Sequence, residues 1–158
     1  MKLLLESLFL HQAWADATLL AAVGAHAEAV GDEGLRKLLH HMVTVQRFYL
    51  ARIAARPFDR AREAEVQLSS GELMELFKQT HAEALALVHG ITESGLERRF
   101  GPVLQTEFTV AEGLTQIVMH SQNHRGQCLM RLREMVGKAP TLDYILWARE
   151  RPAADWGR

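Results

Sequence analysis

The chain has 158 residues, of which 48% are hydrophobic and 23% are charged, a balance typical of one globular domain rather than of a disordered chain. Its formal net charge of −1, with no dense cluster of lysine and arginine, argues against a nucleic-acid-binding protein, because such proteins usually neutralise phosphates with excess basic residues. The single cysteine excludes a disulfide within the chain and gives no support for secretion.

We do not expect the first residues to form a signal peptide. Glu6 follows only three leucines, which is too short for the apolar region of such a peptide. No apolar run approaches the length of a membrane span. We therefore expect a cytoplasmic protein that does not interact with membranes.

Four long segments carry apolar residues at the period of a helix. They span about residues 3–30, 33–55, 70–93 and 110–136. Gly24 is a weak point of the first segment, where the helix can bend or end early, since glycine costs up to about 1 kcal/mol in a helix interior. Ser69 with Glu72, and Thr109 with Glu112, form capping boxes that start the last two helices.

The remaining segments connect or follow these helices. Residues 58–67 are polar without a steady period, and we predict a crossover loop; residues 96–108 are predicted to form a second, longer connection. A short final helix is expected over residues 142–149. The pattern predicts an all-α fold, a four-helix bundle that forms a single domain over residues 1–150, with a frayed tail over residues 151–158.

A histidine pair lies on the inward face of the fourth predicted helix. His120 and His124 are four residues apart, so both imidazoles project from the same face and can reach one transition-metal ion. The spacing alone is not specific, because eight histidines in this chain produce about 0.4 such pairs by chance. His41 lies on the inward face of the second helix and is a candidate third ligand. Three neutral histidines leave coordination positions open, as in catalytic sites; the alternative is three core histidines that bind backbone or carboxylates.

Several other residues have two interpretations. We expect His11 to be a core-edge histidine bonded to a neighbour rather than a ligand. His81 and His89 lie off the apolar stripe of the third helix and are expected to be solvated or half-buried. Arg52 is expected to form a surface ion pair rather than to bind a substrate carboxylate. Cys128 could border the site, but a small buried packing residue is the expected role.

Three segments carry a resemblance to a known family: LLHHMVTVQRFYLAR, MHSQNHRGQCLMRLREMVGKAP and the closing LDYILW. Together they resemble the DinB-like (DinB/YfiT-like) superfamily over nearly the whole chain, and the HxxxHRGQ segment is the most specific part. The resemblance implies a four-helix bundle with a three-histidine metal site. It also implies supporting roles for Arg125 and Gln127. The ligands that it implies are His41, His120 and His124.

The wider superfamily includes transferases and isomerases that use low-molecular-weight bacterial thiols. The resemblance therefore implies a divalent-metal-dependent enzyme, with thiol-dependent transferase or isomerase chemistry as one interpretation. Zinc or nickel is the expected metal, with iron, copper and manganese as alternatives, since ligand type does not select among them. The competing interpretation is a non-catalytic stress-response or binding protein with a structural or incidental metal. We expect a homodimer, because an apolar helix face can pair with its copy; the sequence identifies neither catalytic residues nor a thiol pocket.

Overall fold

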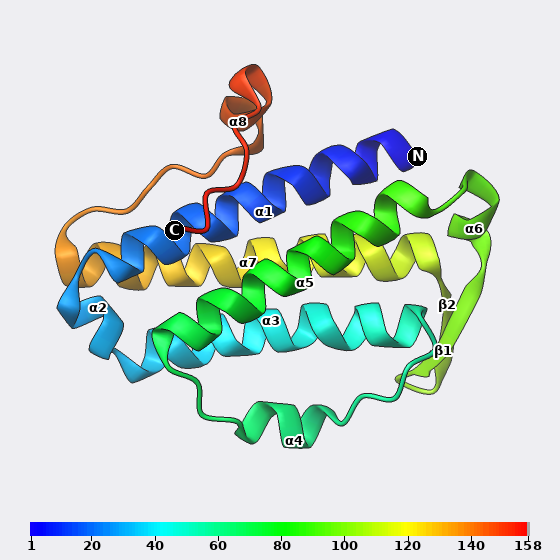
Figure 1. The fold of residues 1–158 in the computed structure, drawn as a ribbon, viewed down its shortest axis with the longest axis horizontal. Helices are drawn as coiled ribbons and strands as arrows, with labels where there is room; N and C mark the ends of the chain where they lie inside the picture. The colour runs from blue at the N-terminus through cyan, green and yellow to red at the C-terminus, as the bar shows by residue number, and fades with distance from the viewer. Residues whose placement is uncertain (158) are drawn as a thin grey trace.

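Four long helices lie side by side in the computed structural model, which describes residues 1–157 (Figure 1). The helices are α1 (Lys2–Gly24), α3 (Glu33–Ile53), α5 (Ser70–Gly90) and α7 (Val110–Val136). α3 packs mainly on α7, and α1 packs mainly on α5. The predicted all-α four-helix bundle is therefore confirmed.

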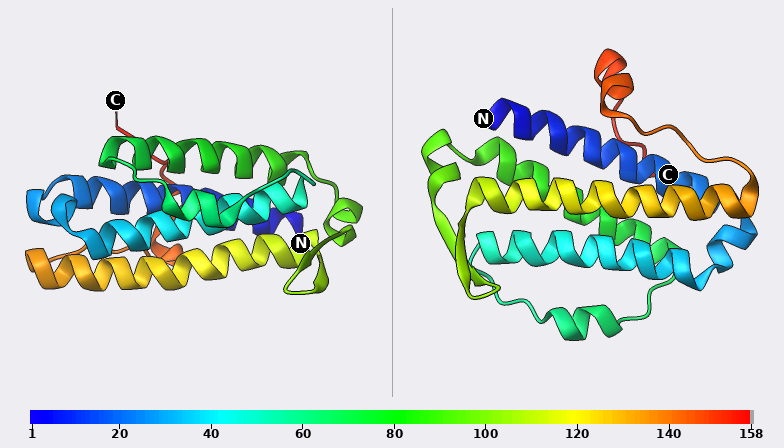
Figure 2. Two further views of the ribbon diagram at one scale, coloured as in Figure 1. Left: turned by 90° about the horizontal axis from the view of Figure 1, so that it is seen from below. Right: turned by 180° about the vertical axis from the view of Figure 1, so that it is seen from behind.

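Short elements join and flank the four long helices. They are α2 (Ala27–Gly31), α4 (Arg60–Glu65), α6 (Glu93–Glu97), β1 (Arg99–Val103), β2 (Thr106–Thr109) and α8 (Tyr144–Glu150). The two views in Figure 2 show the β1–β2 hairpin at the end of the bundle where α7 begins. α4 contacts α3 and α8 contacts α1, on opposite sides of the bundle (Figure 1).

Two sequence predictions about the connections need correction. The first helix ends at Gly24, where we expected a weak point, and α2 is a separate turn rather than its continuation to Val30. Residues 58–67 are not only a loop, because the Asp59 side chain accepts a hydrogen bond from the Arg62 backbone and caps the short helix α4. The hairpin was not predicted.

The apolar interior is divided into two clusters, and each long helix contributes to both. One cluster contains Leu19, Leu39, Phe77 and Leu132. The other contains Phe9, Leu50, Val88 and Leu114, and it continues into the hairpin through Phe100 and Val103. On every long helix the residues of one cluster precede those of the other, so the clusters fill opposite halves of the bundle.

A layer of buried polar side chains separates the two clusters, and each side chain in it is at most 2% exposed. The layer consists of Asp16 from α1, Gln46 from α3, His81 from α5, and Ser121 and Arg125 from α7. Asp16 accepts hydrogen bonds from Arg125 Nε at 2.8 Å, His81 Nε2 at 2.8 Å and Gln46 Nε2 at 3.2 Å. Burial raises the pKa of Asp16, but the charge of Arg125 and the contacts with His81 outweigh it and lower the pKa below its ordinary value. One ionised carboxylate therefore links three helices to α1.

The end of the chain packs against this polar layer. The Trp156 ring stacks on His81, with ring centroids 5.4 Å apart. Trp147 Nε1 in α8 donates a hydrogen bond to the Pro152 carbonyl at 3.0 Å. We expected a frayed tail over residues 151–158; in the described part, Pro152 and Trp156 make these contacts, and residue 158 lies outside it. The prediction of a solvated or half-buried His81 is wrong, since this side chain is 1% exposed.

The hairpin contacts the start of α7 through Phe100, which lies against Gly113. A Cβ atom at Gly113 would lie 2.6 Å from Phe100 Cζ and 3.1 Å from Ile53 Cδ1. Phe100 is 6% exposed, so its rigid ring has little room to move away. Glycine at this position therefore allows the hairpin to lie close to the helix.

Replacing Gly113 with alanine should lower the free energy of unfolding by about 1–3 kcal/mol, the usual cost of overpacking a core. Gly126 in the same helix is the matched control, because a Cβ there would meet nothing within 4 Å. Gly126→Ala should stabilise the protein by up to about 1 kcal/mol through helix propensity. Urea denaturation measures both changes, and a stabilising Gly113→Ala would contradict the close contact with Phe100.

Candidate metal centre

Three histidines meet where α3 and α7 face each other. His41 lies in the middle of α3, while His120 and His124 lie one turn apart on α7. One ligand nitrogen from each ring lies within 4.8 Å of the others, and the ring centroids are 4.4 to 5.1 Å apart. All three rings are half-buried. The structure therefore brings together the three histidines that the sequence singled out.

The hydrogen-bond pattern of the cluster leaves ring nitrogens of His124 and His120 free to bind a metal. His124 Nδ1 donates to Gln127 Oε1 at 3.0 Å, because a carbonyl oxygen can only accept. Nε2 of His124 then carries the lone pair that a metal ion requires. His120 Nδ1 is buried and has no hydrogen-bond partner among residues 1–157, and such buried atoms are rare. The supporting role of Gln127 thus has a direct geometric basis.

The surroundings of the cluster lower the pKa of two of its histidines, His120 and His41. Burial, followed by the charges that His124 and His41 would carry, lowers the pKa of His120 to about 4. Burial, followed by the charge of His124, also lowers the pKa of His41. Transition metals bind neutral imidazole, so these lowered pKa values favour the form of His41 and His120 that can bind a metal.

The lowered pKa of His120 predicts a pH dependence for the metal-free protein. Between the folded-state pKa of about 4 and the ordinary value of 6.5, the unfolded chain binds more protons than the folded one. The free energy of unfolding should therefore fall as the pH is lowered through this window. We expect a loss of about 1–2 kcal/mol between about pH 7 and pH 5, discounted because the ring is partly exposed.

Urea denaturation with a chelator present measures this loss at the two pH values. His120→Gln is the control, because glutamine does not titrate. The free energy of unfolding of this variant should therefore decrease less between the two pH values. Equal losses in the two proteins would contradict the assignment to His120.

A cleft with a volume of about 350 Å³ opens beside the histidines. Its lining includes His41 and His120, and α4 and the hairpin contribute Arg60 and Leu104 to it. A second hollow of about 320 Å³ adjoins it and shares Tyr49, Leu104 and Gln116 with it. The cluster is therefore open to a small organic molecule.

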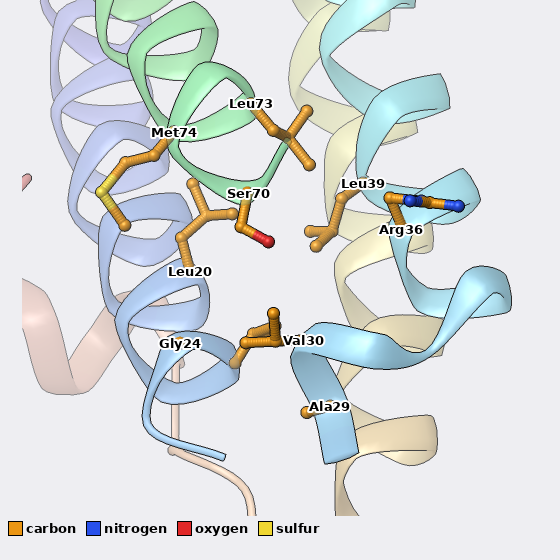
Figure 3. Close-up of a pocket in the computed structure, with 10 residues that line it drawn as sticks. Leu20, Gly24, Ala29, Val30, Arg36, Leu39, Ser70, Leu73 and Met74 are labelled. Atoms are coloured by element: carbon orange, nitrogen blue, oxygen red, sulfur yellow. The ribbon is translucent and has the colours of Figure 1, made fainter. Parts of the chain in front are cut away.

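Another hollow lies between α1, α2, α3 and α5, near the end of the bundle where α2 joins α1 to α3 (Figure 3). It has a volume of about 50 Å³ and is lined mainly by apolar side chains of α1, α2, α3 and α5, including Leu20, Leu39 and Leu73. It includes none of the three histidines and has room for little more than one water molecule. We therefore do not regard it as the functional site.

The remaining candidates lie outside the histidine cluster. His11 Nε2 donates to the Leu142 carbonyl at 2.9 Å, which confirms a core-edge histidine bonded to a neighbour. Arg52 donates to the Pro102 carbonyl at 3.1 Å, so the prediction of an ion pair is wrong. Cys128 is fully buried, and burial raises the pKa of its thiol to about 12, as expected for a packing residue.

Two residues that the structure brings to notice were not predicted from the sequence: Asp16 in the buried polar layer and Arg60 in the lining of the cleft. Asp16 interrupts an otherwise apolar run in α1, and an acidic residue in such a run is a usable signal for a buried ion pair. Arg60 lies in a polar segment of ordinary composition, and nothing local relates it to the cleft. Only the path of the chain between α3 and α5 places it there.

Comparisons with known proteins agree with this geometry. The family model of the DinB superfamily matches residues 11–128, a segment that includes all three histidines. Searches of curated proteins and of solved structures gave no match. In the part of the chain that the structure describes, every helix is too short or too polar to cross a bilayer. Since the matched segment covers most of the bundle, the chain belongs to the DinB superfamily.

Proposed function

We propose that His41, His120 and His124 bind one divalent transition-metal ion and that the protein is a metal-dependent enzyme. The observation that carries this proposal is the donor set, in which three nitrogens lie within 4.8 Å of one another. No other histidine, cysteine or carboxylate of residues 1–157 belongs to this group. Three protein ligands with further positions open are typical of catalytic rather than structural metal sites.

Zinc or nickel is the metal that we propose, and iron, copper or manganese would occupy the same ligands with other affinities. A divalent ion at this position would supply a Lewis acid that lowers the pKa of a substrate thiol and so provides a thiolate at neutral pH. We therefore propose thiol-dependent transfer or isomerisation as the reaction class. Cys128 is not the source of the thiol, because it is buried and its pKa is raised to about 12.

Residues around the cluster have defined roles in this proposal. The Gln127 side chain holds the His124 ring through Nδ1 and thereby directs Nε2 toward the other histidines. Phe48 and Tyr49 line the cleft beside His41 and offer aromatic rings to an apolar part of a substrate. Gln116 lines both hollows and offers an amide that can bind a polar group of a substrate.

An activity assay with a panel of low-molecular-weight thiols and a fluorogenic electrophile tests the proposed reaction class. Turnover should be lost on chelation, should return with one metal, and should be absent in His124→Ala. His89→Ala is the control, because His89 is exposed and lies outside the cluster. Full activity in His124→Ala would contradict the proposal. A large metal-dependent rise in melting temperature without turnover would favour a non-catalytic binding protein instead.

A further inference from the structure

The cleft beside the histidines is lined by one cationic side chain and by no acidic one. Arg60 is the only one of its ten lining residues with a formal charge at neutral pH, and none of them is acidic. The polar remainder consists of His41, His120, Gln116 and the Tyr49 hydroxyl. The apolar walls are formed by Val45, Phe48, Pro102, Val103 and Leu104. The cleft is therefore apolar with one cationic group.

Arg60 has no carboxylate partner in residues 1–157. It is the first residue of α4, and its guanidinium lies 5.9 Å from the centre of the Phe48 ring. Glu63 in the same short helix pairs with Arg47 of α3 instead. Arg60 is near enough to the cluster that its charge contributes to the lowered pKa of both His41 and His120. The guanidinium is thus available to a ligand in the cleft.

A guanidinium beside a divalent ion is unfavourable unless an anion lies between them. Two like charges repel strongly in a partly buried site, because protein atoms screen them less well than water does. An anion that contacts both groups turns this repulsion into two attractions. The planar fork of one arginine matches a carboxylate, which it can bind through two parallel hydrogen bonds.

The hairpin contributes an exposed apolar side chain to the lining of the cleft. Leu104 and Gln105 form its two-residue turn, and both have positive φ angles, 50° and 64°. Turns of this kind favour asparagine and glycine, so leucine is a strained choice. Its side chain is 88% exposed and lines both hollows near the histidines. A strained, exposed leucine at this position is consistent with a contact to an apolar part of a ligand.

We propose that the metal centre acts on a small carboxylate with an apolar body. The carboxylate lies between the metal and Arg60, and the apolar body lies along Phe48 and Leu104. This inference rests on the metal site proposed above, and it adds the chemical class of the substrate or co-substrate.

Binding of model ligands to the Co²⁺-loaded protein tests this inference, because the visible absorption bands of cobalt report both metal binding and changes at the metal. The probes are 3-phenylpropionate, its neutral amide 3-phenylpropanamide, and acetate. Arg60→Gln should weaken 3-phenylpropionate about tenfold, the usual effect of losing one charge-assisted hydrogen bond, and should leave the amide unchanged. Arg62→Gln is the matched control, because it removes the same charge from the same helix outside the cleft.

Replacing Leu104 with asparagine tests the apolar contact separately. Leu104→Asn should weaken 3-phenylpropionate several-fold and leave acetate unchanged, because acetate is too short to reach the hairpin. The melting temperature should not fall, since asparagine tolerates a positive φ angle. A weaker ligand in a protein of equal or greater stability excludes misfolding as the cause.

The outcomes separate the two proposals. Normal cobalt bands with equal effects of Arg60→Gln and Arg62→Gln on 3-phenylpropionate would overturn the carboxylate inference alone. Equal weakening of the acid and the amide by Arg60→Gln would also overturn it. Failure of the wild-type protein to bind Co²⁺ would overturn the proposed metal site, and the carboxylate inference with it.

Discussion

Replacement of Asp16 by alanine is expected to lower the free energy of unfolding by about 3–5 kcal/mol, the usual cost of leaving a buried charge without its partner. Arg125 is 2% exposed and would lose its carboxylate 2.8 Å away, while His81 would lose its buried acceptor. Because Asp16 joins side chains from all three other long helices, no local adjustment can replace it. Urea denaturation at neutral pH measures the change.

Two further variants show whether the buried charge is the cause. Adding Arg125→Met to Asp16→Ala should recover part of the lost stability, because it removes the unpaired guanidinium. Glu33→Ala, which breaks an exposed ion pair with Lys37, should have no measurable effect. A loss below about 1 kcal/mol in Asp16→Ala would mean that the polar layer is not a fixed part of the native core.

Replacement of His124 by alanine is expected to reduce affinity for the proposed metal more than any change outside the three histidines. Changes in groups that only orient a ligand usually cost about 10–100-fold in affinity, and loss of a ligand costs more. We therefore expect Gln127→Ala to fall in that range and His41→Ala and His124→Ala to exceed it. Competition with a chromophoric chelator measures the affinities.

A comparison of the variants separates the orienting role of Gln127 from the role of His124 as a ligand. Gln127 affects binding only through its hydrogen bond to His124, so Gln127→Ala should have no further effect in the His124→Ala background. His89→Ala, at an exposed position, should bind the metal like the wild type. If His124→Ala bound the metal with wild-type affinity, His124 would not be a ligand.

The starts of three long helices could be predicted from the sequence because their signals are local. Both predicted capping boxes form, since Ser69 and Thr109 accept from the backbone of Glu72 and Glu112. Asp32 caps α3 by a similar local contact, since its side chain accepts a hydrogen bond from the Leu35 backbone. In each case the two partners lie within three or four residues, so the sequence contains the whole interaction.

Interactions between distant segments could not be predicted in the same way. His81 pairs with Asp16, which lies 65 residues away on another helix, so the helical period alone placed it near solvent. The hairpin lacks the usual turn residues, because Leu104 and Gln105 occupy positions where asparagine and glycine are common. Arg60 reaches the cleft only through the path of the crossover.

The histidine cluster could be predicted in part, because it combines a local spacing with a contact between distant segments. The spacing of His120 and His124 within one helix predicts that they share a face. Their meeting with His41 depends on α3 packing against α7, which the apolar stripes suggest but do not define. The resemblance to the DinB-like superfamily, which is most specific in the HxxxHRGQ segment, assigned His41 to the same site as His120 and His124. The geometry of the cluster agrees with this assignment.

The most direct measurement is the metal content of the protein purified without a histidine tag or a nickel column. We predict close to one equivalent of a divalent transition metal per chain in the wild type and almost none in a variant with alanine at positions 41, 120 and 124. Circular dichroism should show that the variant retains its helical fold. Wild-type protein that contains no metal, and that binds none in titration, would contradict a metal site formed by the three histidines.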